Sequence, residues 1–173
     1  GIIVKNPKYK KKVSDDTIIL KEFKTSLNKL SSVNYKNICE LIVGQLQSKE
    51  HLYPLILEIT FEHALLHHSY SKYYCYLLDL LHKKFNKLDL INKQIDISYK
   101  NIDNLKMDDS SQYSNLCNKN KQIDKLIGYC LFLNELENIH IINNRIEPLI
   151  LKLIENMKEK LSEDEMYKCA ICL

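Results

Sequence analysis

Apolar side chains recur at three- and four-residue steps through most of this chain. The first such stretch follows Ser14 and Asp15, and either residue can cap a helix because its side-chain oxygen accepts from the free amides of the first turn. The apolar positions of this stretch are Ile19, Leu20, Phe23, Leu27 and Leu30. Since this spacing keeps them on one face of a helical period, the pattern predicts an amphipathic helix.

The same periodicity predicts three further helices before residue 86. Ser31-Ser32 breaks the first helix and can cap the second, and Ser69 or Ser71 can cap the fourth. The third starts near Leu52, with Pro54 in its first turn, where the missing amide is unpaired anyway. The three apolar stripes are Ile38, Leu41, Ile42 and Leu46; Leu52, Leu55, Ile56 and Ile59; and Tyr74, Leu77, Leu78, Leu81 and Phe85.

The pattern weakens over residues 87–120 and then returns. Apolar positions from Leu88 to Leu105 predict one helix, and the polar run over 107–114 predicts a solvated loop. Further helices are expected around residues 121–133 and 146–157. Ser162, followed by acidic residues in the first turn, is a start signal for a last helix.

The composition favours helices joined by polar loops. Gly and Pro occur only three times each, whereas turn-dense β architectures need them for positive φ and fixed turns. We therefore expect an all-α fold of about eight helices in antiparallel pairs, stacked as a helical-repeat solenoid of about four pairs. A compact bundle of the same helices is the alternative. A basic N-terminal arm, residues 1–14, precedes the helical domain, residues 15–173.

The charge balance is mildly basic and does not by itself indicate nucleic-acid binding. The net charge is +3, and Arg145 is the only arginine. Because bidentate reading of guanine favours Arg, any RNA contact is expected to be directed at the backbone and tolerant of sequence. The arm can hold phosphates, with Tyr9 stacking on a base, or it can be a solvated terminus. Its cationic residues are Lys5, Lys8, Lys10, Lys11 and Lys12.

Neither the cysteines nor the apolar runs indicate export or membrane insertion. Six cysteines stand singly or as the pair Cys169/Cys172, and reduced, helix-buried thiols are the preferred interpretation over a disulfide framework. No apolar run reaches the roughly 18 residues of a membrane span. We expect a cytoplasmic protein without a membrane partner, and a monomer.

Several segments together resemble the middle domain of eukaryotic translation initiation factor 4 gamma. Ser26–Ser31 is similar to its LNKL-type helix end, Ile59–Ala64 to its IFEKA-type helix, and Tyr70–Tyr74 to its aromatic-Ser-x-x-Tyr turn. Further on, Leu126–Asn134 is similar to its RFIGELYKL-type segment and Glu165–Leu173 to its ESLECLCRLL-type helix. These similarities run in family order over about four-fifths of the chain.

The resemblance implies a crescent of HEAT-type helical pairs that binds the DEAD-box helicase of initiation, factor 4A, and contacts RNA. The hairpin from Leu52 to Phe85 is its expected docking edge. The helicase-binding residues would be Glu58, Glu62, His63 and Tyr70, with Tyr9 in the arm. The RNA-binding residues would be Lys5, Lys8, Lys10, Lys11, Lys12, Lys121 and Lys125. Equally, Glu58 and Glu62 can be ordinary solvated charges beside a core made by Ile59 and Phe61.

The chain departs from the family pattern at three places. The helix near Lys121 lacks the Arg-containing run that usually precedes it, and the arm has no Trp anchor, so that Ile3, Pro7 or Tyr9 would have to substitute. The fifth helical pair of the family is absent from this sequence, which leads us to expect a chain truncated at its C-terminal end.

Candidate chemistry is sparse. His63 and His67 are spaced i, i+4, but Ala64 stands where a zinc protease needs Glu, and no further ligand is clearly placed to complete a tetrahedral set. Among the tyrosines of residues 73–76, the spacing predicts that Tyr74 is core and that Tyr73 and Tyr76 rim it. The sequence has no phosphate-cradling Gly loop, nucleophile elbow or plausible triad. We expect neither an enzyme nor a cofactor or metal site.

Three functions remain open from the sequence. The first is a translation-initiation scaffold domain that binds and stimulates a DEAD-box helicase and contacts RNA, with other initiation factors bound through regions outside this chain. The second is a related middle domain of a nonsense-mediated-decay, cap-binding or splicing scaffold. The third is a helical bundle with its own metal- or nucleotide-dependent activity, which would persist without any helicase.

Overall fold

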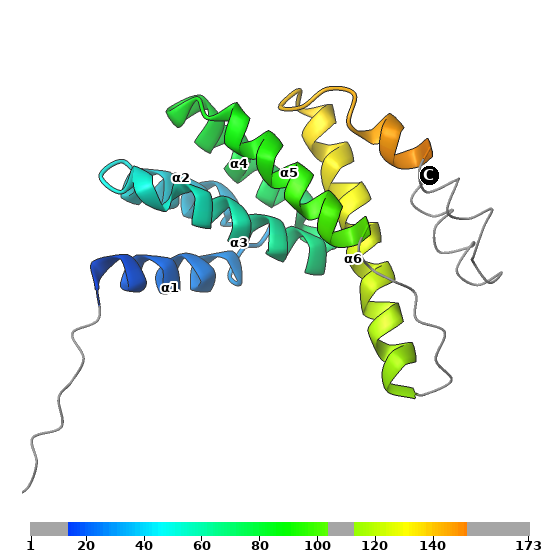
Figure 1. Ribbon diagram of the computed structural model, residues 1–173. Helices are drawn as coiled ribbons and strands as arrows, with labels where there is room; N and C mark the ends of the chain where they lie inside the picture. The colour runs from blue at the N-terminus through cyan, green and yellow to red at the C-terminus, as the bar shows by residue number, and fades with distance from the viewer. Residues whose placement is uncertain (1–13, 104–112, 152–173) are drawn as a thin grey trace, which may run out of the picture.

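The computed structural model describes residues 14–103 and 113–151, and these ranges are all-helical, with no strand among them (Figure 1). The elements are α1 (Asp15–Leu27), α2 (Tyr35–Leu46), η1 (Glu50–Leu52), α3 (Tyr53–Leu66), η2 (His68–Tyr70), α4 (Ser71–Phe85), α5 (Leu88–Asp103) and α6 (Tyr113–Asn138). Residues 146–151 are also helical. The helix expected after Ser162 lies outside the described residues.

Two of the predicted helix starts are confirmed and two are wrong. Ser14 caps α1 by accepting from the amide of Thr17 at 3.3 Å, and Pro54 lies in the first turn of α3. The start at Ser31-Ser32 is wrong, because α2 begins only at Tyr35. There the side chain of Asn34 accepts from the amide of Ser31 at 2.8 Å, and this bond folds residues 31–34 into a turn before the helix starts.

The starts of α4 and α6 also differ from expectation. Tyr70 is the residue before α4, and Ser71 is already its first helical residue, so neither serine caps this helix. Helix α6 begins at Tyr113. The last two positions of the expected loop are therefore helical, while the rest of that loop, residues 107–112, lies outside the described residues.

The helices contact one another in a regular alternation. Helix α3 packs against α1 and α5, and α4 packs against α2 and α6; α6 also has a large contact with α3. The predicted apolar stripes supply most of these contacts, but Leu41 and Leu55 are exceptions, since their side chains are 67% and 44% exposed. The apolar side chains of α3, α4, α5 and α6 meet in one core.

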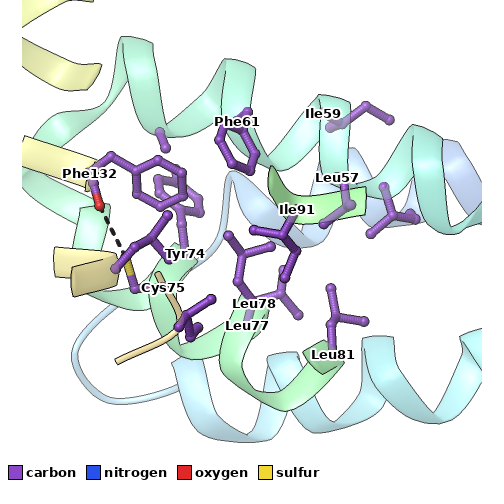
Figure 2. Close-up of a cluster of buried hydrophobic side chains, with 14 of the residues drawn as sticks. Leu57, Ile59, Phe61, Tyr74, Cys75, Leu77, Leu78, Leu81, Ile91 and Phe132 are labelled. Atoms are coloured by element: carbon purple, nitrogen blue, oxygen red, sulfur yellow. Dashed lines mark hydrogen bonds between the residues drawn. The ribbon is translucent and has the colours of Figure 1, made fainter. Parts of the chain in front are cut away.

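Figure 2 shows the centre of this core. The ring of Phe61 on α3 meets the ring of Phe132 on α6 edge to face, with centroids 5.0 Å apart. The thiol of Cys75 on α4 donates to the carbonyl of Phe132 at 3.8 Å. Cys39 and Cys75 are buried free thiols, as expected, and burial raises the pKa of Cys39 to about 12. Such thiols are unreactive at neutral pH because the thiolate is suppressed.

A glycine allows the closest approach between α3 and α6. A methyl group built on Gly128 would lie 2.4 Å from the carbonyl oxygen of Leu65. No real Cβ comes so near to a backbone atom, so α6 can cross α3 at this distance only where it has no side chain. The glycine is required by this crossing and not by a turn.

Polar contacts fix the last described turn. The carboxylate of Glu137 accepts from the amides of Arg145 at 2.6 Å and Ile146 at 3.0 Å, and thus caps the helix of residues 146–151. The guanidinium of Arg145 reaches back to Asp96 at 3.1 Å and Asn92 at 3.3 Å, both on α5. The only arginine of the chain therefore joins this turn to α5 and is engaged within the fold.

Candidate protein-binding surface

Two acidic side chains stand on the solvent face of α3. Glu58 and Glu62 are one helical turn apart and exposed, and neither has a hydrogen bond or ion pair with another described residue. Their neighbours Ile59 and Phe61 are buried. The segment that resembles the family motif is therefore divided, with its apolar side chains in the core and the carboxylate of Glu62, like that of Glu58 just before the segment, available to a partner.

His63 lies at the border between this face and the core. It is half-buried, and its Nδ1 atom is buried without a hydrogen-bond partner. Its ring is 5.9 Å from that of His67 and 6.3 Å from that of Tyr74. Burial, and then the charge of His67, lower the pKa of His63, so that at neutral pH it presents an uncharged imidazole next to Glu62.

Tyr70 belongs to the same neighbourhood through Tyr74. Tyr70 is 42% exposed at the end of η2. The pKa of Tyr74 is raised to about 12, chiefly by burial, and the neighbouring Tyr70 contributes to this rise. The structure thus brings Glu62, His63 and Tyr70 to one end of the α3–α4 hairpin.

The tyrosines of α4 form a cluster that the sequence did not predict. Tyr73, expected at the rim, is buried instead, because Tyr35 from the start of α2 covers it at a ring distance of 4.8 Å. The ring of Tyr76 meets Tyr35 edge to face at 5.1 Å, and Tyr70 lies 5.9 Å from Tyr73. The only indication of this cluster in the sequence was the spacing of Tyr73 and Tyr76, which are one helical turn apart on α4. Their partner Tyr35 lies 38 positions before Tyr73, and local spacing does not reveal it.

These rings line a cavity between α2, α4 and the end of α6, which we call the tyrosine pocket. Its volume is about 390 Å³. The lining used below consists of Tyr35, Tyr73, Tyr76, Lys72, Asp79 and Glu135. A cavity of this size admits one side chain or a small ligand, and aromatic walls with a few polar groups are typical of binding sites.

The predicted RNA-binding lysines are only partly within reach of the structure. Lys121 and Lys125 are exposed and lie one turn apart on α6. The arm residues Lys5, Lys8, Lys10, Lys11 and Lys12, and also Tyr9, lie outside the described residues. The structure therefore brings the two α6 lysines together and leaves their relation to the arm untested.

Comparison with known proteins adds no relative to this picture. No family profile, curated protein or solved structure matches the chain. The resemblance to the initiation-factor middle domain therefore depends on the quoted segments and on where the fold places them.

The described residues contain neither a grouped set of metal ligands nor a helix suited to a membrane. Within residues 14–103 and 113–151, no three or more His, Cys, Asp or Glu side chains are grouped as metal ligands are. His63 and His67 approach each other, but no third ligand joins them in this part of the chain. None of the described helices has both the length and the apolar character that crossing a membrane requires.

Proposed function

We propose that this domain is a translation-initiation scaffold that binds and stimulates a DEAD-box RNA helicase of the initiation factor 4A type and contacts RNA. The observation that carries the proposal is the division of the Ile59–Ala64 segment. Phe61 and Ala64 are buried, whereas Glu62 is exposed without a partner among the described residues. The buried residues account for the fold of this segment, and the exposed Glu62 is its residue that can contact a partner.

The packing order supports a HEAT-like solenoid. In such a solenoid, the first helix of each pair stacks on the first helix of the next pair, and the second helices do the same. The contacts of α3 with α1 and α5, and of α4 with α2 and α6, follow this order. We take α1/α2, α3/α4 and α5/α6 as three pairs, with residues 146–173 contributing to a fourth. The contact between α3 and α6 is the feature that a compact bundle would share.

The proposed mechanism is a population shift without chemistry of its own. Glu58 and Glu62 would meet a basic surface on the C-terminal lobe of the helicase, with His63 and Tyr70 completing the contact. A scaffold that binds one arrangement of the two lobes more tightly raises the population of that arrangement. The arm lysines, Lys121 and Lys125 would contact RNA backbone in the cytoplasm, beside the helicase.

The deciding experiment measures binding to a purified factor 4A-type helicase by calorimetry at physiological salt. We expect Glu62→Lys to weaken binding about tenfold or more, since reversing a charge at a complementary interface costs more than about 1.4 kcal/mol. It should leave the melting temperature unchanged, because Glu62 makes no contact that supports the fold. Glu147→Lys, an equally exposed reversal outside this surface, is the control and should bind normally.

Two results would defeat this proposal. One is the absence of binding by the wild-type domain to any DEAD-box helicase, tested with initiation, decay and splicing members in parallel. The other is binding that Glu62→Lys reduces only as far as it reduces the folded fraction. Binding to a decay or splicing helicase alone would transfer the scaffold function to that process.

A further inference from the structure

The tyrosine pocket contains a carboxylate that no other described group neutralises. Glu135 on α6 is half-buried, and its carboxylate has no hydrogen bond or ion pair with a described residue. It lies close enough to Cys75 that its charge adds to the rise in the pKa of that thiol, which burial chiefly causes. An ionised group that is partly removed from water gains from an external cation.

The second carboxylate of the pocket differs from Glu135. Asp79 on α4 pairs with Lys83, one turn further along the same helix, at 2.6 Å. Lys83 is largely exposed and this pair is local, so its contribution to stability is small. The charge of Asp79 is therefore balanced by a cation of the same helix, while Glu135 is the group without a counter-ion.

The aromatic walls already attract cations of the chain itself. The ammonium of Lys72 lies 5.2 Å from the centroid of the Tyr73 ring, and that of Lys36 lies 6.0 Å from the centroid of Tyr35. Both distances are within the range of cation–π attraction. The aromatic rings and the carboxylate of Glu135 favour a cation in this pocket, and the ammonium of Lys72 competes for the same place.

We propose that the tyrosine pocket binds an arginine side chain of a protein partner. A guanidinium is planar, so that it can stack on a tyrosine ring while it donates two parallel hydrogen bonds to one carboxylate. It is also less strongly hydrated than an ammonium, which lowers the cost of entering a half-buried cavity. Glu135 is the acceptor, and Tyr76 supplies the ring face, since Lys72 already lies over Tyr73 and Lys36 over Tyr35.

The site goes beyond the proposed function and does not require that the partner be a helicase. The tyrosine pocket is nevertheless continuous with the proposed helicase surface, because Tyr70 lies 5.9 Å from Tyr73. A partner that covers Glu62 and Tyr70 can therefore extend an arginine into the pocket. The two sites make separate predictions, since Glu62 is on α3 and Glu135 is on α6.

The test uses two capped tripeptides, acetyl-Gly-Arg-Gly-amide and the same peptide with citrulline in place of Arg. Binding is followed by NMR of the tyrosine ring signals. We expect saturable shifts of Tyr35 and Tyr76 with the Arg peptide, and about tenfold weaker binding with the uncharged citrulline peptide. Glu135→Gln should weaken binding of the Arg peptide to a similar extent, because the charged acceptor is lost.

Lys72→Gln gives the opposite sign and cannot be mistaken for misfolding. Removing the competing ammonium should tighten binding of the Arg peptide by roughly twofold or more, as expected for one screened like charge. A site for an anion, such as an RNA phosphate, would instead be weakened by Lys72→Gln. Glu147→Gln, outside the pocket and exposed, should leave binding unchanged.

Three outcomes would overturn the proposal: absence of ring shifts with the Arg peptide, equal binding of the Arg and citrulline peptides, or weaker binding by Lys72→Gln together with ring shifts caused by a uridine oligonucleotide. The helicase assay separates this inference from the proposed function. Peptide binding in a domain that binds no helicase would leave the pocket site standing and defeat the helicase proposal. Helicase binding that requires Glu62, with no peptide in the pocket, would support the helicase proposal and defeat the pocket site.

Discussion

Replacing Gly128 by alanine tests the crossing of α3 and α6 directly. The added methyl group would lie 2.4 Å from the carbonyl oxygen of Leu65 and 3.0 Å from its carbonyl carbon. Both atoms belong to the backbone of α3, which cannot rotate away as a side chain can. Removing this clash requires α6 to move outward by roughly 1 Å, because ordinary van der Waals contacts of a methyl group begin at about 3.4 Å.

Two opposing contributions set the size of the effect. Displacing α6 loosens the contact of Phe132 with Phe61, which lies 5.0 Å away, and overpacking of this kind costs about 1 to 3 kcal/mol. Alanine also gains about 1 kcal/mol over glycine inside a helix. Because the clash involves backbone and the shift affects several buried neighbours, we expect overpacking to prevail. The net loss should be up to about 2 kcal/mol.

Gly44 on α2 is the matched control. A methyl group there meets no atom within 4 Å, so Gly44→Ala should stabilise the protein by up to about 1 kcal/mol. The free energies of unfolding are measured by urea titration of both variants and the wild type. The two substitutions are chemically identical, so opposite signs would isolate the packing contribution.

The reasoning would be refuted if Gly128→Ala stabilised the protein as much as Gly44→Ala does. A subtler refutation comes from the double variant with Leu65→Ala. That second change removes only the side chain of Leu65 and leaves the clashing carbonyl in place, so it should not restore stability. Rescue by Leu65→Ala would show that the conflict is with a side chain and that the backbones are further apart.

Two further predictions concern pH and the last described turn. Burial lowers the pKa of His63 in the folded protein, so that the unfolded chain binds a proton at this histidine more readily than the folded chain does. The stability that the uncharged imidazole contributes is therefore present above the usual pKa of about 6.5 and is lost as the pH falls below it. His63→Gln should therefore reduce the decline in the free energy of unfolding, measured in urea, between about pH 7 and pH 5. The exposed control His68→Gln should leave this decline unchanged. An equal decline in the wild type and both variants would exclude His63 as its source. Glu137→Ala removes the acceptor for the amides of Arg145 and Ile146 and should lower the free energy of unfolding by about 1 to 2 kcal/mol in the same assay. The control is Glu40→Ala, at an exposed position of α2. If Glu137→Ala lowered the stability no more than this control, the cap would contribute nothing.

The helices were predictable because the signals for them are local. The spacing of Phe23 and Leu27 alone indicates the buried face of α1, and Ser14 indicates its start. The start of α2 was not predictable in the same way. Ser31-Ser32 is a good cap by composition, but Asn34 captures the amide of Ser31 and delays the helix to Tyr35. Two local signals competed there, and the sequence does not say which of them is stronger.

The surface that would meet a partner depends on contacts between distant segments. Glu62 was proposed from the resemblance of its segment to a known motif, and no spacing within the chain indicated it. Tyr73 was misplaced at the rim because the ring that buries it belongs to Tyr35, on α2. Nothing in the sequence indicated Glu135 as a site residue. Whether a glutamate on a long helix has a counter-ion depends on which side chains the fold places around it. Each of these helices has one face that its own spacing predicts and other faces whose neighbours come from distant segments of the chain. The binding edges of such a protein are therefore the part that the sequence predicts least, even where it predicts the fold well.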